Sequence, residues 1–357
     1  MLTLPELLER TLELGASDMH LVPDLAPLFR VSTELAPVGE YPVLTAADTT
    51  GFVRQMLDEH RWEQFLERRD MDFSTTAPSG ARFRVNAHFQ RGVVAIAFRA
   101  VSNKVPTFQR LNLPEVIESF ARLPRGLVLV TGQTGHGKST TLASMIQLIN
   151  ETSSRHIITL EDPIEYEFHN VKSVIEQREL GSDVPTFASG LRHALRQDPD
   201  VILVGEMRDL ETTSAAITAA ETGHLVLSTM HTQSAAQTVE RILDIYPGDQ
   251  QNQIRAMLAN TLQAVVSMAL FKRADGPGMA PACEIMVCNA AVRNCIRTNR
   301  VHEIANIIQT SASAGMVPLD DAIKGLLYTG KITRAQALAA ASKSDRMAAA
   351  LGMKEVA

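Results

Sequence analysis

The residues with the clearest chemistry lie at 132–139 and read Gly-Gln-Thr-Gly-His-Gly-Lys-Ser, a complete GxxxxGK[ST] phosphate loop. In such a loop backbone N–H groups converge on phosphate oxygens, the lysine contacts the β- and γ-phosphates, and the serine hydroxyl ligates Mg²⁺. A strand-like stretch, Leu127–Val130, precedes the loop, and a helical pattern, Thr140–Ile149, follows it. The sequence therefore predicts a nucleoside triphosphate site formed by Gly132, Gln133, Thr134, Gly135, His136, Gly137, Lys138, Ser139 and Thr140.

A carboxylate follows a second apolar strand. The run Asp200-Val-Ile-Leu-Val-Gly-Glu206 is apolar and ends in an acid. In a parallel α/β sheet the carboxyl ends of the strands line the ligand crevice. Glu206 is therefore placed to reach the Mg²⁺ ion, directly or through water, as Ser139 does. The alternative is an ordinary acid at the end of a strand.

Three more acids cluster in Leu160-Glu-Asp-Pro-Ile-Glu165, again after a predicted strand. Hydrolysis needs a group that orients water in line with the γ-phosphate. We assign Glu165 to that role, with Glu161 and Asp162 shaping the loop. A solvated acidic turn is the alternative, and the spacing does not decide between them.

His231 and three arginines complete the set of candidates. His231 follows the predicted strand Leu225–Thr229 and could sense the γ-phosphate, although a lone histidine is more often structural. Arg82, Arg84 and Arg99 lie on two predicted strands of the first hundred residues. They could form a solvated face or reach phosphates of a neighbouring site as arginine fingers.

The elements that must position these residues fall into two groups. Residues 1–100 combine a helical stripe at Leu4–Leu14 with strands at Asp70–Phe73, Ala81–Phe89 and Gly92–Arg99, which predicts an α+β domain. Residues 101–114 are predicted to be a linker, because prolines favour extended backbone before them.

Residues 115–357 are predicted to form a RecA-like α/β domain with a helical C-terminal region. Apolar runs of strand length lie at Leu127–Val130, His156–Leu160, Val201–Val204 and Leu225–Thr229. Helical patterns separate them, which is typical of a parallel sheet. Beyond Pro247 we expect helices, the first carrying a helical period from Ile254 to Leu270.

Composition narrows the class of protein. The 357 residues are 45% hydrophobic and carry a net charge of −6, so a protein held on nucleic acid by phosphate neutralisation is not expected. The N-terminus has no apolar signal core, and no run approaches the ~20 apolar residues of a membrane span. We expect a cytoplasmic protein that can dock on a membrane partner. The cysteines Cys283, Cys288 and Cys295 have no CxxC spacing and are expected in the core.

Taken together, the motifs resemble the secretion-superfamily ATPases of type IV pili and type II secretion. The similarity covers nearly the whole chain. It rests on the motifs Gly15–Leu21, Arg82–Asn86, the phosphate loop, Glu161–Glu165 as the aspartate box, Gln177–Glu179, the Walker B run Val201–Thr212, Ala220–His224, and Met230–Thr232 as the histidine box. Ala291-Val-Arg-Asn-Cys-Ile296 is similar to the Ala-Ile-Arg-Asn-Leu-Ile motif of the retraction branch.

The resemblance implies an N-terminal PAS-like domain joined to the RecA-like domain, in a homohexameric ring that hydrolyses ATP with Mg²⁺. The catalytic roles then fall on Glu165, Glu206, His231, Arg84 and Arg99. The ring is implied to turn an inner-membrane platform protein (PilC-like) at the cytoplasmic face of the membrane. Pilin subunits would then leave the fibre and drive twitching motility. A paralogous retraction ATPase is a further implied partner, and no nucleic acid is expected.

The resemblance leaves rival functions open. Assembly and secretion relatives usually carry an extra N-terminal domain and a four-cysteine zinc site. This chain has no CxxC pair, which favours the retraction branch. An ATP-binding accessory subunit of a sister motor is the alternative from another class. The family more often has Pro and Ser where Gln133 and His136 stand, and Ile and Leu where Val292 and Cys295 stand.

Overall fold

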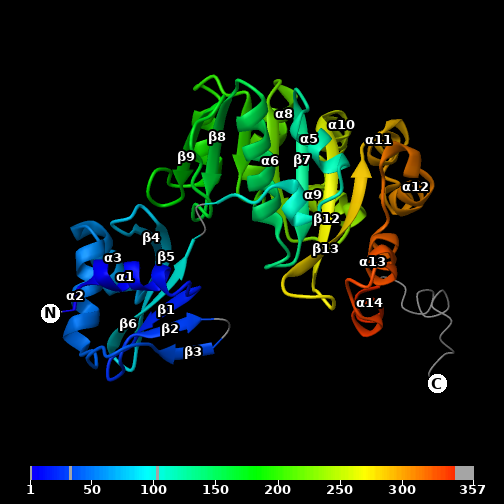
Figure 1. The fold of residues 1–357 in the computed structure, drawn as a ribbon. Helices are drawn as coiled ribbons and strands as arrows, with labels where there is room; N and C mark the ends of the chain where they lie inside the picture. The colour runs from blue at the N-terminus through cyan, green and yellow to red at the C-terminus, as the bar shows by residue number, and fades with distance from the viewer. Residues whose placement is uncertain (1, 32–33, 102–103, 342–357) are drawn as a thin grey trace. The chain divides into compact units, whose positions relative to one another are not determined.

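The structure is a computed structural model that describes residues 2–31, 34–101 and 104–341 (Figure 1). Contacts divide the chain into two compact units. The first comprises Met1–Lys104 with Glu165–Glu167, and the second comprises Val105–Ile164 with Phe168–Ala357. No helix among the described residues is both long and apolar enough to cross a bilayer.

The first unit is one antiparallel sheet covered on one face by helices. Its strand order is β3-β2-β1-β6-β5-β4. Alternation along β5 sends Phe83, Val85 and Ala87 into the core, where the helices bring Leu7 and Phe65. The elements are α1 (Leu4–Glu13), β1 (Asp18–Leu21), β2 (Leu28–Val31), β3 (Glu34–Pro37), α2 (Ala46–Met56), α3 (Glu59–Arg68), β4 (Asp70–Thr76), β5 (Arg82–Gln90) and β6 (Val93–Ala100).

The second unit contains a seven-stranded sheet in the order β13-β12-β7-β11-β10-β8-β9. All neighbouring strands pair in parallel except β12 and β13. Its strands are β7 (Gly126–Gly132), β8 (His156–Glu161), β9 (Val174–Glu179), β10 (Val201–Val204), β11 (Leu225–Met230), β12 (Leu262–Lys272) and β13 (Met279–Val287). The predicted α/β class, with a parallel sheet, is confirmed.

Helices cover both faces of this sheet, as Figure 1 shows. Strand β7 is fully buried, and its side chains alternate between two cores: Leu127 and Leu129 face one, Val128 and Val130 the other. The helices are α4 (Phe108–Leu111), α5 (Val116–Ala121), α6 (Lys138–Thr152), α7 (Phe187–Ala194), α8 (Leu210–Glu221), α9 (Ala235–Asp244), α10 (Gln251–Thr261), α11 (Ala290–Arg297), α12 (Ile304–Thr310), α13 (Leu319–Tyr328) and α14 (Arg334–Ala340).

The helix expected from Ile254 to Leu270 is wrong in its second half. Helix α10 ends at Thr261, and the chain continues directly as β12. Strand β12 pairs in parallel with β7 and in antiparallel fashion with β13, which takes up Met279–Val287. A strand buried on both faces carries an unbroken apolar run, so the run Val265–Leu270 fits a helical period equally well.

The stretch 101–114 contains more structure than a linker pattern suggests. Helix α4 lies in it, and Phe108 is buried in the core that α5 and α6 share. The Ser144 hydroxyl donates a 2.7 Å hydrogen bond to the Pro106 carbonyl. Residues 102–103 of this stretch lie outside the described residues.

Candidate functional site

The phosphate loop joins β7 to α6 and relies on two glycines at positions where a side chain would be costly. Gly132 has φ 140°, and a Cβ there would lie 2.5 Å from the Met268 carbonyl oxygen of β12. Gly137 has φ 84° and begins α6 without a side-chain cap. The first-turn N–H groups of this 15-residue helix therefore carry no side-chain acceptor at their N-cap, as anion binding requires.

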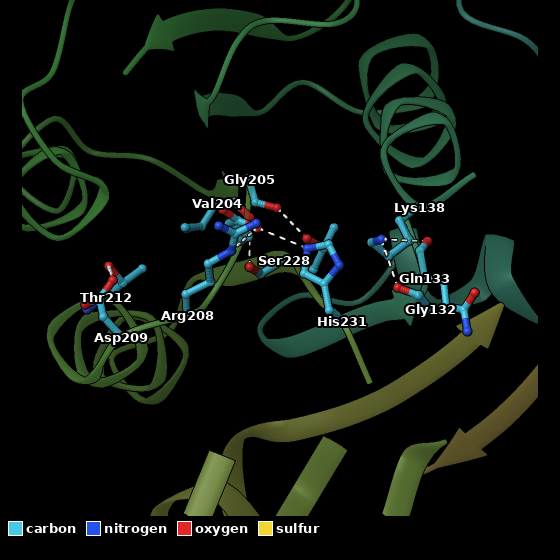
Figure 2. A network of polar contacts seen from close by, with 12 residues as sticks. Gly132, Gln133, Lys138, Val204, Gly205, Arg208, Asp209, Thr212, Ser228 and His231 are labelled. Carbon is cyan, nitrogen blue, oxygen red and sulfur yellow. Dashed lines mark hydrogen bonds and ion pairs between the residues drawn. The ribbon is translucent and has the colours of Figure 1, made fainter. Parts of the chain in front are cut away.

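Lys138 folds back over the loop. Its ammonium donates to the carbonyl oxygens of Gly132 at 2.9 Å and Gln133 at 3.0 Å, as Figure 2 shows. The residue is buried, whereas Ser139 next to it is exposed. A buried cation held by loop carbonyls places positive charge beside the open helix N-terminus.

His136, which the sequence left unexplained, attaches the loop to β12. Its Nδ1 lies 3.0 Å from the Met268 carbonyl oxygen, and because a carbonyl only accepts, Nδ1 must carry the proton. One residue before the loop, the hydroxyls of Thr131 and Ser267 are 2.8 Å apart in the core. The loop and β12 therefore form one hydrogen-bonded layer.

Glu206 lies just beyond β10 and meets two side chains. Arg208 Nε is 2.8 Å and His231 Nε2 is 3.2 Å from the same oxygen, Oε2. Within the described residues the structure records no hydrogen bond to Glu206 Oε1. The Glu206 side chain is 21% exposed and that of Arg208 68%, so this ion pair lies near the surface rather than in the core.

Strand β11 fixes the backbone on which Glu206 stands. The Ser228 hydroxyl donates to the Val204 carbonyl at 2.7 Å, and the Thr229 hydroxyl donates to the Gly205 carbonyl at 2.6 Å. The Met207 N–H returns a 3.0 Å bond to the Thr229 carbonyl. Figure 2 shows Val204, Gly205 and Ser228 near Arg208 and His231.

The acids of the aspartate box do not share one site. Glu161 accepts from the Thr159 hydroxyl at 2.6 Å and from the Gln177 amide at 3.1 Å. Glu179, which is buried, accepts from the Ile164 N–H at 3.2 Å. Glu165 is exposed, and residues 165–167 group with the first unit. Glu161 of the box and Glu179 of β9 thus have polar partners that shape the loop, whereas Asp162 and Glu165 are exposed.

The arginines of the first unit differ from one another. Arg99 of β6 is held by Asp18, whose Oδ1 lies 2.8 Å from its Nε, yet the side chain is 71% exposed. Arg84 of β5 lies directly opposite Arg99 and is exposed. Arg82 donates to the Ser74 hydroxyl at 2.8 Å. Arg84 and Arg99 therefore present charge side by side on the open face of the sheet.

Asp18 is the counter-ion of Arg99, and its Oδ2 also lies 3.7 Å from Arg30 Nε. Burial raises the pKa of Asp18, but the Ser17 hydroxyl and Arg99 outweigh that effect and hold the pKa below its usual value. The carboxylate therefore stays charged and keeps Arg99 Nε engaged, while most of the Arg99 side chain remains exposed.

The retraction-like motif lies on α11, and its arginine caps another helix. Arg293 donates to the carbonyls of Ala259 and Asn260 at the end of α10 and to the Gln263 side chain at 3.0 Å. Val292 and Cys295 are buried in the same core, which fits their apolar replacements of Ile and Leu. All three cysteines are free and buried, as expected.

A buried carboxylate, which the sequence analysis did not single out, supports the segment after His231. Glu284 of β13 accepts a 2.7 Å hydrogen bond from the Ala235 N–H, the first of α9. Burial raises its pKa above the ordinary value of 4.5, while the N–H groups of Ala235 and Leu319 oppose the rise. Glu284 thus joins the N-termini of α9 and α13 to the sheet.

Sequence reasoning also missed Arg208 and Met268. Arg208 stands two residues after Glu206 in the Walker B run, so its proximity was available from spacing. Met268 acts through its backbone carbonyl, which no side-chain pattern reveals. Only the correct assignment of β12 as a strand would have brought it next to the phosphate loop.

Known proteins resemble this chain along most of its length. Residues 4–316 match the family Type II/IV secretion system protein (T2SSE). The type IV pilus retraction ATPase PilT of Pseudomonas aeruginosa is 44% identical over 332 residues, 93% of this chain and 96% of that protein. The type IV pilus ATPase PilU of the same organism is 37% identical over 340 residues, 95% of this chain and 89% of that protein.

A solved structure agrees with these relatives. The crystal structure of the pilus retraction motor PilT with bound ADP superposes with a TM-score of 0.90 at 41% identity, covering 97% of this chain and 99% of that one. The chain belongs to the type II/IV secretion system protein family and, within it, to the ATPases that include the pilus retraction motor PilT.

Proposed function

We propose that this chain is an ATP-hydrolysing motor that drives type IV pilus retraction. The observation that carries the proposal is the phosphate loop at the carboxyl ends of β7, β10 and β11, with Glu206 and His231 beside it. The end-to-end similarity to the retraction ATPase PilT supports the retraction direction.

The residues present fit a nucleotide and Mg²⁺. The uncapped N-terminus of α6 and the glycine positions accept phosphates, and Lys138 neutralises them. The exposed Ser139 hydroxyl and the open Oε1 of Glu206 would hold Mg²⁺, directly or through water. When bound, the ion screens the phosphate charge that builds up during transfer.

Each remaining candidate has a role in the proposal. Glu165 polarises the attacking water, and its exposure fits a group that has to meet water. His231 links Glu206 to the nucleotide. Arg84 and Arg99 reach the phosphates of a neighbouring copy, which their exposure on the sheet allows.

The proposed assembly is a homohexamer that docks on the cytoplasmic face of the inner membrane. There it would engage a PilC-like platform protein and remove pilins from the fibre. The relative PilU supports a paralogous ATPase as a further partner. We propose two domains, 1–100 and 115–357, joined by residues 101–114.

A deletion strain tests this function. Loss of a retraction motor leaves cells over-piliated and unable to twitch, whereas loss of an assembly ATPase leaves them without pili. Complementation with Glu165→Gln should not restore twitching, because the amide keeps the shape but cannot polarise water.

The isolated protein separates the motor from an accessory subunit. Purified wild type should hydrolyse ATP, and Glu165→Gln should bind ATP with turnover reduced about 100-fold. If Glu165→Gln turns over ATP like wild type, Glu165 is not the water-orienting residue. If wild type binds ATP without turnover, the chain is an accessory subunit.

A further inference from the structure

We infer that Arg208 is a positioning residue that holds the carboxylate of Glu206 in its working orientation. The inference rests on the proposed role of Glu206 in hydrolysis. Arg208 Nε and His231 Nε2 both contact Oε2, at 2.8 Å and 3.2 Å. The two contacts engage one oxygen and leave the other, Oε1, without a recorded hydrogen bond among the described residues.

The backbone around Glu206 is fixed, but its side chain is not fixed by that backbone. Gly205 N–H donates to the Leu160 carbonyl at 2.8 Å, and Met207 is buried and bonded to β11. A glutamate has three side-chain torsions that these bonds do not restrain. Within the described residues, the recorded contacts that restrain the carboxylate are those from Arg208 and His231.

The backbone at Arg208 is restrained by the residues on both sides of it. Met207 precedes it in the core, and Asp209 follows it as the N-cap of α8, where its Oδ1 accepts from Thr212 N–H at 2.8 Å. A long side chain on a fixed backbone loses less freedom when it pairs, so the contact is formed more of the time. In the view of Figure 2, His231 lies between Arg208 and Lys138.

Arg208 brings a permanent positive charge to this contact, because arginine is protonated at every physiological pH. The chain contains an ordinary surface pair for comparison: Arg192 and Glu211 are 3.4 Å apart with both side chains more than half exposed. Such pairs contribute little.

The test is a double-mutant cycle on the full-length protein, with single-turnover hydrolysis of radiolabelled ATP to measure slow rates. Arg208→Gln should lower the hydrolysis rate about 10-fold, while the Kd for ADP changes less than about 2-fold. The reason is that Arg208 orients the Glu206 carboxylate and does not itself contact the nucleotide. Arg208→Lys keeps the charge and should retain more activity than Arg208→Gln. Arg192→Gln is the matched control and should match wild type.

The combined variant decides the inference. If Arg208 acts through Glu206, the pair Arg208→Gln with Glu206→Gln hydrolyses ATP no more slowly than Glu206→Gln alone. If the double variant instead loses rate by the product of the two single losses, the inference is overturned. Weaker ADP binding by Arg208→Gln would also overturn it, since either result means that Arg208 acts elsewhere than through Glu206. Wild-type activity of Glu206→Gln would instead reject the proposed role of Glu206, and wild-type activity of Arg208→Gln would reject only the positioning role.

Discussion

The two sides of the candidate site are built in opposite ways. On the phosphate-loop side, backbone carbonyls of Gly132, Gln133 and Met268 accept hydrogen bonds from Lys138 and His136. On the carboxylate side, Glu206 is held by the side chains of Arg208 and His231, which are 68% and 40% exposed. One side is restrained by the fold itself and the other by contacts that solvent can replace.

The difference indicates a division of labour. Backbone contacts in a buried layer are hard to change without unfolding, so nucleotide affinity should be robust to surface substitutions. Exposed ion pairs contribute little stability, so they can rearrange during a catalytic cycle at small cost. We expect binding to follow the first side and turnover the second.

Lys138→Ala should give the largest effect. The substitution removes the buried ammonium that neutralises the phosphates. Nucleotide affinity should therefore fall by about 3 kcal/mol, or roughly 100-fold. Fluorescent ADP binding measures the loss. Retained affinity would mean that the loop binds through its backbone alone.

Glu206→Gln should lower turnover without lowering nucleotide affinity, and so test whether the two sides of the site act independently. The amide removes the charge opposite Arg208 but leaves the loop intact, so turnover should fall about 100-fold while the Kd for ADP stays within about 3-fold of wild type. Steady-state and single-turnover rates measure the first quantity and calorimetry the second. A parallel loss of affinity would show that the sides are not independent.

His136→Ser should give a smaller effect, confined to binding. Serine is too short to reach the Met268 carbonyl, so one hydrogen bond of about 1 kcal/mol is lost and ADP should bind about 5-fold more weakly. Turnover at saturating ATP should not change. A fall in that rate with unaltered affinity would place His136 on the catalytic side instead.

The smallest effect concerns Glu284, the buried carboxylate that supports α9. Because its pKa is raised in the fold, its contribution to stability is full below its ordinary value of 4.5 and is lost as pH rises through the folded pKa. Glu284→Gln does not titrate, so the free energy of unfolding of wild type relative to this variant should fall as pH rises from 4.5. Denaturant unfolding across that range measures the slope, and a rising difference would contradict the assignment.

Where a motif is a short stretch of chain, the sequence and the structure agree on where its residues lie. The phosphate loop, the end of β10 and the position of His231 follow from short patterns in which a strand leads into a turn. Arg208 lies in the Walker B run, but residue type and spacing alone do not show that its side chain pairs with Glu206. The helical pattern from Leu262 to Leu270 is misleading because β12 is buried on both faces and so loses the alternation that marks a half-buried strand.

The contact between Gly132 and Met268 has a consequence for protein engineering. The two residues are separated by more than a hundred positions, yet a Cβ at one would fall 2.5 Å from the backbone of the other. A chimera that takes residues 126–140 from one relative and 262–272 from another would combine surfaces that were never matched. Recombination points between homologues should therefore keep both segments from the same parent, even though most of the chain lies between them.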